Sequence, residues 1–381
     1  MKICAIICEF NPFHNGHKYL IEKAKRQSDC DAVLCIMSGN FTQRGEVCIF
    51  DKYTRARHAI AGGADCVIQL PAPFAVAPAE IFAKGAIKIL SSIPDVTEIA
   101  FGCESADDFI KAAELLIDES ALFKKVLSEN LNAGESYVKS YAAAFAACGG
   151  KKALVENPNN ILGLEYAKAI LRANANIKLT PVLRKGAGYN DATIKENFSS
   201  ASAIRKNLSD GAVWRNVPDF VYADFKNAVS PEEFEYAARF SLFNTSAADL
   251  KKVYGCGEGL ENKLKTLENE SYESIVEKST SKRYSSSRIR RILCANMLGL
   301  HGADTESFLK SDLYIKPLAI KKERADEILS ALSKSSFPVV CGISDEGLSA
   351  EAKKCFGRDK YEFALYNHIT RTEGKDYMIL I

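Results

Sequence analysis

The strongest structural signal in this sequence lies in residues 6–20, Ile6-Ile7-Cys8-Glu9-Phe10-Asn11-Pro12-Phe13-His14-Asn15-Gly16-His17-Lys18-Tyr19-Leu20. The apolar run at residues 3–8 has the length and β-branched content of a buried parallel strand. Asn11-Pro12 ends that strand, because proline lacks a backbone donor and biases the preceding residue away from helix. A helix begins at Asn15, and its apolar positions face the predicted sheet. His14 and His17 are therefore expected at the first turn of a helix that follows the first strand.

The start of this predicted helix suits a phosphate group. Its unpaired N–H groups and the positive end of its macrodipole attract anions, and histidines there can donate hydrogen bonds to an α-phosphate under attack. We expect Gly16, which has no Cβ, to let a base or ribose approach the backbone. Two other interpretations stay open: the histidines only cap the helix, or they bind zinc, although acidic and cysteine partners at ligand spacing are missing nearby.

The motif resembles that of the HxGH nucleotidyltransferases, which include small-molecule adenylyltransferases and class I aminoacyl-tRNA synthetases. The run from Glu9 to His17 is similar to a narrower family, the bacterial tRNA(Met) cytidine acetate ligases. The resemblance implies that His14 and His17 are catalytic. It also implies that ATP is bound by Ile7, Cys8, Glu9, Phe10, Asn11, Pro12, Phe13, His14, Asn15, Gly16, His17, Lys18, Tyr19 and Leu20.

Length and composition describe an ordinary globular protein. A chain of 381 residues, 47% hydrophobic and 26% charged, has room for about two or three domains. The net charge of +2 means that any nucleic-acid surface must be a local patch. Residues 1–3 run straight into a strand, and the longest apolar runs fall short of the roughly 20 residues of a membrane helix. We expect a cytoplasmic protein without a membrane partner.

The twelve cysteines are expected to be free thiols. Several of them lie inside apolar runs, where cysteine behaves as a small buried hydrophobe. C-x-x-C pairs, the usual signature of structural zinc, are missing from the sequence. Free thiols in this number fit a reducing compartment, and we expect the protein to hold no metal of its own.

Strand-like and helix-like segments alternate through the first half of the chain. Strand patterns at 32–37, 65–70 and 96–101 are separated by helical patterns at 51–61 and 79–90. This alternation predicts a parallel sheet with helices on both faces and with ligands beyond the carboxyl ends of the strands. His14, Ser38-Gly39-Asn40 and Gly102 all fall at such ends. We expect Gly102 to pack a nucleotide against its bare backbone, although it could also be a plain turn residue.

A polar loop, residues 38–46, follows the second predicted strand. Its Asn, Gln and Arg side chains could hold a carboxylate or phosphate, or could simply be solvated. Lys52, Arg55, Arg57 and His58 follow as a basic helix face. The sequence does not decide which of these four side chains turn inward.

Two asparagines mark another candidate contact. Asn157-Pro158-Asn159-Asn160 is a typical helix start. If one asparagine caps the helix, the other is available for a ribose or base edge. Resemblance to the ligase family implies nucleotide contact at Asn159 or Asn160, with the choice open.

Phosphate-binding candidates follow a strand predicted at 177–183, which Pro181 marks as an edge strand or strand end. Arg184 and Lys185, with Gly186 and Gly188 after them, suit a phosphate cradle. The segment at residues 199–205 resembles the serine-rich helix start of nucleotidyltransferases. Its Ser200 and Arg205 would hold the leaving pyrophosphate. These signals place the nucleotidyltransferase domain at residues 1–212.

Residues 213–381 are predicted to form a mostly helical second domain. Residues 281–293 contain an aromatic side chain and five cations without an acid: Lys282, Arg283, Tyr284, Arg288, Arg290 and Arg291. Ile289, Ile292 and Leu293 form an apolar stripe, so most of the cations are expected to point outward. The segment is either a solvated helix face or a surface for RNA phosphates, with Tyr284 stacking on a base. Its resemblance to the ligase family implies tRNA binding. Short strands at 337–341 and 377–381 are assigned to packing.

The predicted fold is α/β, a Rossmann-like parallel-sheet nucleotidyltransferase core with an appended mostly helical domain. The residues themselves predict attack on the α-phosphate of ATP, with Mg2+ accompanying the nucleotide. The resemblance adds acetate, an acetyl-adenylate intermediate, and transfer to the exocyclic amine of the wobble cytidine of elongator tRNA(Met). The product would be N4-acetylcytidine. The alternatives are a small-molecule adenylyltransferase and a non-catalytic RNA-binding protein.

Overall fold

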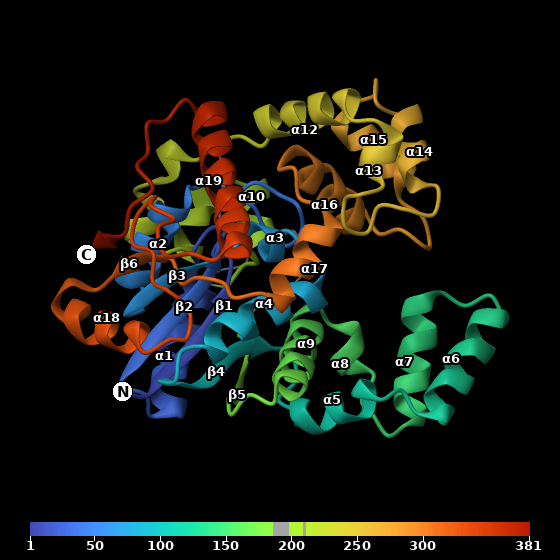
Figure 1. Cartoon of the computed structure of the whole chain (residues 1–381). Helices are drawn as coiled ribbons and strands as arrows, with labels where there is room; N and C mark the ends of the chain where they lie inside the picture. Colours follow the sequence, from blue (N-terminus) through green and yellow to red (C-terminus); the bar gives the residue numbers. More distant parts are fainter. Residues whose placement is uncertain (186–197, 209–210) are drawn as a thin grey trace.

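A seven-stranded sheet forms the centre of the molecule (Figure 1). The computed structural model describes residues 1–185, 198–208 and 211–381. The strand order is β5-β4-β1-β2-β3-β6-β7. Five strands are parallel to one another: β1 (Ile3–Cys8), β2 (Ala32–Ser38), β3 (Cys66–Leu70), β4 (Val96–Cys103) and β5 (Lys178–Leu183). The predicted parallel core is confirmed, and β5, which contains Pro181, is an edge strand as predicted.

Helices cover both faces of this sheet because successive residues of a strand point to opposite faces. Ile3, Ala5 and Ile7 of β1 pack into one core cluster with α4 (Ala79–Ser91) and α9 (Pro158–Ala173). The alternate residues of β1 join a second cluster with α1 (Asn15–Ser28) and α2 (Lys52–Ala61). The carboxyl end of β1 therefore lies between two layers of helices.

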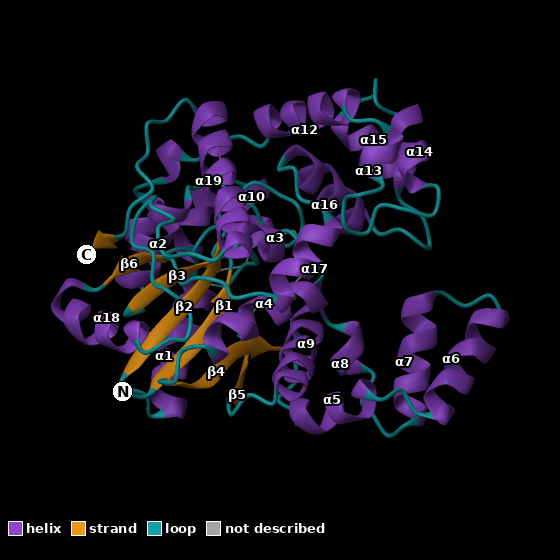
Figure 2. Ribbon diagram, in the orientation of Figure 1, coloured by secondary structure: helices purple, strands orange, loops and turns teal. Residues whose placement is uncertain are grey.

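Residues 109–147 contain helices that extend the α9 side of the molecule. Figure 2 shows α6 and α7 beside one another at its periphery. The other helices of this half are α3 (Ala72–Ala75), α5 (Phe109–Ile117), α6 (Ala121–Asn132), α7 (Tyr137–Ala147), α8 (Ala153–Glu156) and α10 (Ala201–Lys206).

A helical subdomain follows, with its own apolar core. That core also takes in Phe41, Val47 and Tyr366, so the subdomain packs against the loop after β2. The remaining α-helices are α11 (Asp219–Tyr222), α12 (Glu232–Asn244), α13 (Ala247–Leu250), α14 (Leu260–Thr266), α15 (Tyr272–Ser279), α16 (Ser286–Met297), α17 (Gly302–Lys310), α18 (Ala325–Ser333) and α19 (Ala350–Thr370). Short 3-10 turns span Gly211–Asn216, Phe225–Asn227 and Lys322–Arg324.

The last part of the chain returns to the sheet. β6 (Pro317–Ile320) pairs antiparallel with β3, and β7 (Ile379–Leu380) pairs parallel with β6. The strand predicted at 377–381 is therefore confirmed. The strand predicted at 337–341 is wrong, because Val339 is the only one of these described residues that pairs, in an isolated bridge to Ile315. The domain boundary at residue 212 stays a prediction. Residues 213–381 supply two strands, β6 and β7, to the central sheet.

Helix α19 connects the end of the chain to the loop after β2. The buried Glu362 carboxylate accepts a hydrogen bond from the N–H of Asn40. The hydroxyl of Tyr366 donates to the carbonyl of Cys48 at 3.2 Å. These contacts seat α19 against the loop that follows the second strand. In the part of the chain described here, the search for a helix that could cross a membrane found none.

Candidate active site

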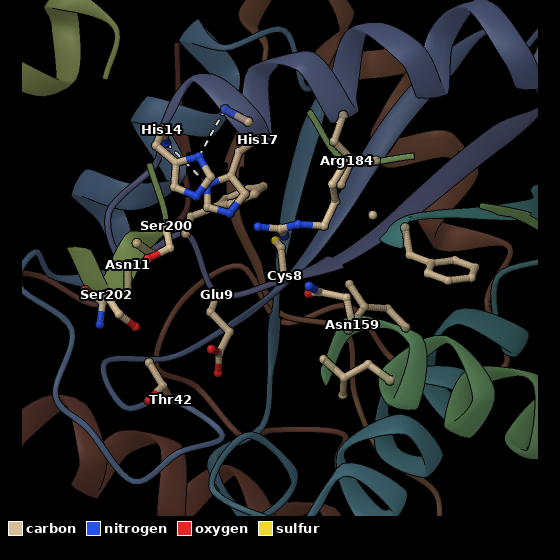
Figure 3. Close-up of a pocket in the computed structure, with 18 of the residues that line it drawn as sticks. Cys8, Glu9, Asn11, His14, His17, Thr42, Asn159, Arg184, Ser200 and Ser202 are labelled. Carbon is tan, nitrogen blue, oxygen red and sulfur yellow. Dashed lines mark hydrogen bonds between the residues drawn. The ribbon is translucent and has the colours of Figure 1, made fainter. Parts of the chain in front are cut away.

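A cavity of about 190 Å3 opens at the carboxyl ends of β1, β4 and β5 (Figure 3). Its lining brings together most of the predicted nucleotide-binding residues: Ile7, Cys8, Glu9, Phe10, Asn11, His14, Gly16, His17, Tyr19, Leu20, Gly102, Asn159, Arg184, Lys185, Ser200 and Arg205. Among the residues that the structure describes, the predicted ones outside the lining are Pro12, Phe13, Asn15, Lys18 and Asn160. The cavity lies where parallel α/β sheets bind their ligands.

His14 and His17 cap the first turn of α1 reciprocally. The Nδ1 atom of His14 accepts a hydrogen bond from the N–H of Gly16 at 3.0 Å. The Nδ1 atom of His17 accepts one from the N–H of His14 at 3.3 Å (Figure 3). A neutral histidine whose Nδ1 is an acceptor carries its proton on Nε2. Capping therefore occupies one nitrogen of each ring and leaves Nε2–H as a hydrogen-bond donor.

Both histidines are neutral. Burial, with the charges of Arg184 and Arg205, lowers the pKa of His14 to about 3. Burial, with His14 and Arg184 nearby, lowers the pKa of His17 well below its usual value. The two rings stack with their centroids 3.6 Å apart, which suits two neutral rings. Each ring can give a hydrogen bond to an anion without adding a charge of its own.

Glycine at position 16 makes room for a neighbouring ring, because a Cβ there would lie 2.8 Å from Cε1 of His14. Gly16 also lines the cavity, so its predicted contact with a nucleotide stays a prediction. Gly102 lines the cavity, and a Cβ there would lie 3.4 Å from Cγ of Arg184. The Arg184 side chain therefore passes across Gly102, and Figure 3 shows its guanidinium group beside Cys8 and below His17.

The polar loop after β2 forms one wall of the cavity. The Glu9 carboxylate accepts a hydrogen bond from the N–H of Gln43 at 2.6 Å, and burial raises the pKa of Glu9. On the same wall, Arg205 donates to the carbonyl of Asn11 at 2.7 Å and to the Glu46 carboxylate at 2.6 Å. The predicted pyrophosphate ligand Arg205 thus reaches the cavity already paired with a carboxylate.

A buried arginine holds the ends of two strands together. Of the four basic residues on α2, Arg57 is exposed, whereas Lys52, Arg55 and His58 are buried. Arg55 donates to the carbonyls of Phe50 at 3.0 Å, of Glu9 at 2.6 Å and of Ser38 at 3.2 Å, and also to that of Gly39. It therefore fixes the segments that follow β1 and β2, both of which border the cavity.

The two predicted asparagines lie in different surroundings. Asn160 is buried, and its Oδ1 accepts from the N–H of Glu104 at 2.9 Å while its Nδ2 donates to the Ala153 carbonyl at 3.0 Å. Asn159 lines the cavity, and its Nδ2 donates to the Glu104 carboxylate. The choice that the sequence left open therefore falls on Asn159 as the residue that faces the cavity, with Asn160 in a supporting place.

The serine-rich segment begins a helix, as predicted. Ser200 is the N-cap of α10, and its Oγ accepts from the N–H of Ala203 at 3.1 Å. Across the cavity Arg184 follows β5, and the Nζ of Lys185 lies 4.7 Å from the ring centroid of Tyr19. Gly186 and Gly188 of the predicted phosphate cradle lie outside the described residues.

The basic segment precedes and enters α16, and its members have different surroundings. Lys282 and Arg283 are exposed, and Arg283 pairs with Glu258 at 2.7 Å. Arg288 donates to the Gly255 carbonyl at 2.9 Å and 2.7 Å, and its guanidinium lies 4.8 Å from the Tyr284 ring centroid. These residues gather charge and an aromatic ring on one surface.

Arg291 departs from the expectation that most of the cations point outward. It is partly buried, its Nη1 donates to the carbonyl of Gln43 at 3.3 Å, and burial lowers its pKa to about 10. Gly45 packs on the same helix, since a Cβ there would lie 2.5 Å from the backbone of Arg290 and Arg291. The loop that forms the cavity wall is thus in direct contact with the basic helix.

Sequence patterns missed the apolar part of the cavity lining. This part includes Phe82, Phe101, Leu162, Tyr166 and Phe198. Such side chains follow the same helix and strand periodicity as core residues, so the sequence holds no signal that separates the two. For the described residues, the search for groups of three or more His, Cys, Asp or Glu that could hold a metal found none.

The family model described as "HIGH Nucleotidyl Transferase" matches residues 1–376. The fold, the paired histidines at the start of α1 and this match define the class of protein, a HIGH nucleotidyltransferase. A Clostridium botulinum (strain Langeland) protein named tRNA(Met) cytidine acetate ligase is 37% identical over 88% of each chain. One of the same name from Thermoanaerobacter sp. (strain X514) is 33% identical over 96% of this chain and 95% of its own. This chain belongs to the tRNA(Met) cytidine acetate ligase family.

Solved structures of Thermotoga maritima TmcAL have the same fold. The apo form matches with a TM-score of 0.91 at 27% identity, and the form bound with alpha-thio ATP with a TM-score of 0.88 at 26% identity. Each comparison covers 100% of both chains. The resemblance to the ligase family and to HxGH nucleotidyltransferases is therefore confirmed.

Proposed function

We propose that this protein uses ATP to activate acetate and transfers the acetyl group to the exocyclic amine of a tRNA cytidine, forming N4-acetylcytidine. The observation that carries the proposal is the reciprocal capping of His14 and His17. It leaves two neutral Nε2–H donors on histidines that line the cavity, together with other residues of the predicted ATP-binding motif. The names of the relatives support the choice of tRNA(Met) and acetate.

In the first step, a carboxylate oxygen of acetate attacks the α-phosphorus of ATP. The bond from that phosphorus to its bridging oxygen breaks, and pyrophosphate leaves with the electron pair. Hydrogen bonds from His14 and His17 would stabilise the charge that builds on the phosphate oxygens. Arg184 and Arg205 would hold the phosphates, Arg205 by moving from Glu46 to the nucleotide, and Ser200 lies beside them. Mg2+ would accompany ATP on its phosphates.

In the second step, the N4 amine of the cytidine attacks the acetyl carbon of the adenylate. A bond from nitrogen to carbon forms, AMP leaves, and the amine loses one proton. The cytidine must be unstacked to reach a cavity at the end of a sheet, as enzymes that act on bases require. An anticodon wobble base of elongator tRNA(Met) meets this condition, because single-stranded loops present their bases to proteins.

The nucleoside end of ATP has its own candidate contacts. Gly102, Asn159 and Lys185 line the cavity on the side of β4 and β5. Pro12, Phe13, Asn15, Lys18 and Asn160 would act through their neighbours: the Asn15 amide, for example, donates to the carbonyl of Arg215 at 2.8 Å. The residues of the motif thus divide into those that contact nucleotide and those that shape its turn.

The tRNA surface would be the basic segment with Lys282, Arg283, Tyr284, Arg288 and Arg290, with Arg291 at its inner edge. Two cations of this segment, Lys282 and Arg283, are exposed. Arg291 contacts the cavity loop through Gln43. A tRNA bound on α16 would therefore lie next to the loop that borders the reacting groups.

The test is ATP–pyrophosphate exchange with and without acetate, in the presence and absence of tRNA(Met). We expect acetate-dependent exchange that His17→Ala lowers by about a hundredfold or more, as for loss of a transition-state donor. Transfer is then measured on elongator tRNA(Met) transcripts with cytidine or uridine at the wobble position. Turnover of a phosphorylated metabolite without any response to acetate would instead support a small-molecule adenylyltransferase.

A further inference from the structure

One carboxylate in the cavity has an oxygen without a hydrogen-bond partner. Glu9 directly follows β1 and lines the cavity. Its Oε1 atom accepts a hydrogen bond from the N–H of Gln43 at 2.6 Å. Its Oε2 atom accepts none from any described residue, and it is not among the fully enclosed polar atoms of that part of the chain. This second oxygen is therefore available to a donor on a ligand.

The chemistry of Glu9 suits a hydrogen-bond donor and not a phosphate. Burial raises the pKa of Glu9, against the effect of the hydrogen bond from Gln43. Glu46 raises this pKa further, whereas Arg205 and Arg44 lower it, and the net result is a raised pKa. A carboxylate with a raised pKa takes up a proton more readily than an ordinary one. When ionised, it repels the phosphate groups of a nucleotide, so its ligand should carry an N–H or an O–H.

The order of the strands separates Glu9 from the candidate nucleoside contacts. β4 and β5 lie on one side of β1, and β2 lies on the other. Gly102 and Asn159 line the cavity on the side of β4, whereas Glu9 is bonded to Gln43 in the loop after β2. Figure 3 shows the side chain of Glu9 pointing away from the two histidines. The candidate nucleoside contacts and the Glu9 carboxylate therefore lie on different walls.

Gln43 connects Glu9 to the basic segment. Its N–H donates to Glu9, and its carbonyl accepts from Nη1 of Arg291 on α16 at 3.3 Å. Two residues further on, a Cβ at Gly45 would lie 2.5 Å from the backbone of Arg290 and Arg291, so the loop packs closely on α16. An RNA bound along α16 would present an unstacked base at the wall that carries Glu9.

We propose that Glu9 recognises the cytidine that is acetylated and accepts the proton that this cytidine loses. The inference rests on the proposed function, because it needs an acetyl-adenylate and an amine. The Oε2 atom accepts a hydrogen bond from N4–H of cytosine. When N4 attacks the acetyl carbon, a bond from nitrogen to carbon forms and the bond from that carbon to the adenylate oxygen breaks. AMP leaves with the electron pair, and the N4 proton passes to Oε2.

The same hydrogen bond selects the base. A carboxylate accepts from the N4 amine of cytosine, whereas uracil has at this position an oxygen without a hydrogen to donate. A site built to bond an N–H rejects an analogue that lacks it, because its own polar group is left unpaired. Glu9 therefore acts on both the choice of base and the transfer step.

Glu9→Gln tests the choice of base. Glutamine has the same shape and can still accept from Gln43, but it turns an amide donor toward the base. Affinity is measured for elongator tRNA(Met) transcripts with cytidine or uridine at the wobble position, with ATP present and acetate absent. We expect the wild type to bind the cytidine transcript about tenfold more tightly. Glu9→Gln should remove or reverse this preference.

The role as proton acceptor is tested by supplying acetyl-adenylate directly, so that the first step is bypassed. Single-turnover transfer to the cytidine transcript should fall by about a hundredfold or more in Glu9→Gln, as for the loss of a general base. ATP–pyrophosphate exchange is measured on the same variant. A loss of exchange as large as the loss of transfer would overturn the proposal and make Glu9 a ligand of ATP, as the family resemblance implies.

Glu46→Gln is the matched control. It also removes a negative charge from this wall, but the Glu46 carboxylate is already paired with Arg205. It should keep the wild-type preference for cytidine over uridine. The recognition role would be overturned by equal binding of both transcripts to the wild type, by an unchanged preference in Glu9→Gln, or by equal effects of the two substitutions. A wild type without acetate-dependent exchange, even with tRNA present, would overturn the proposed function itself.

Discussion

The Nδ1 atom of His14 accepts a hydrogen bond from the N–H of Gly16, and that of His17 accepts one from the N–H of His14. The centroids of the two histidine rings lie 3.6 Å apart. The same hydrogen bonds that start α1 therefore fix the tautomer of both rings. Folding and the proposed chemistry depend here on one arrangement, because a histidine that lost its cap would also lose the orientation of its Nε2–H.

We expect the rate of ATP–pyrophosphate exchange to show no titration step near pH 6.5 from these histidines. The pKa of His14 is lowered to about 3 and that of His17 lies well below 6.5, so both stay neutral in that range. Below pH 6.5 the two histidines bind protons in the unfolded chain but stay neutral in the native protein. Their contribution to the free energy of unfolding should therefore be complete above pH 6.5 and decrease as the pH is lowered. Urea unfolding between pH 7.5 and 5 measures this, and His17→Asn should show a weaker dependence.

Gly16→Ala should lower exchange activity by about tenfold to a hundredfold, because the new Cβ would lie 2.8 Å from Cε1 of His14 and must displace that ring. Gly357→Ala is the matched control. Gly357 is also helical, and open space surrounds its Cβ position in the described part of the chain. It should gain about 0.5–1 kcal/mol of stability, as glycine-to-alanine changes in helices do. Equal activity in the two variants would contradict the ring-displacement argument.

Arg55→Ala should lower the free energy of unfolding by about 3 kcal/mol or more. The substitution leaves the carbonyls of Glu9, Ser38 and Phe50 buried without their donor. Arg57→Ala, two residues further on the same helix, removes an exposed arginine and should stay within about 0.5 kcal/mol of the wild type. Denaturant unfolding of both variants measures the two changes in the free energy of unfolding. A similar small loss in each would mean that Arg55 is not what holds the two strand ends.

Substituting Lys282 and Arg283 together by alanine should weaken tRNA binding and leave acetate-dependent exchange unchanged. Both residues are exposed on the basic segment, away from the cavity lining among described residues. Each lost phosphate contact should reduce the slope of log affinity against log salt by about 1. Lys125→Ala, an exposed lysine on α6, is the control and should leave the slope unchanged. Identical slopes in all three proteins would place the tRNA elsewhere.

The parallel core could be predicted because its strands are short, continuous apolar runs separated by helical periodicity. β6 escaped prediction because four residues that begin with Pro317 carry no periodic signal. The motif around His14 was recognisable because its strand, turn and helix start are consecutive in the sequence. The sequence did not show which of Asn159 and Asn160 faces the cavity. Their placement depends on hydrogen bonds to Glu104, which lies in another part of the chain.

Side-chain orientation and cavity lining could not be predicted for the same reason, because both depend on contacts between distant parts of the chain. The inward turn of Arg55 depends on carbonyls at the ends of two different strands, and sequence spacing on one helix does not contain that information. The apolar part of the cavity lining has the same sequence periodicity as the core, because Phe82 and Phe101 are core residues that also border the cavity. Sequence patterns predict local secondary structure well, but they do not predict the shape of a cavity between segments that are distant in the sequence.

The bond from the N–H of Asn40 to the Glu362 carboxylate joins residues 322 positions apart. During synthesis the loop after β2 is made early and its anchor on α19 is made near the end. Non-local pairings of this kind form late and slowly. The basic segment on α16 is therefore synthesised before the loop after β2 acquires its support from α19. Because Tyr366 of α19 also enters the core of the helical subdomain, the proposed tRNA surface and the cavity wall both depend on the same late helix.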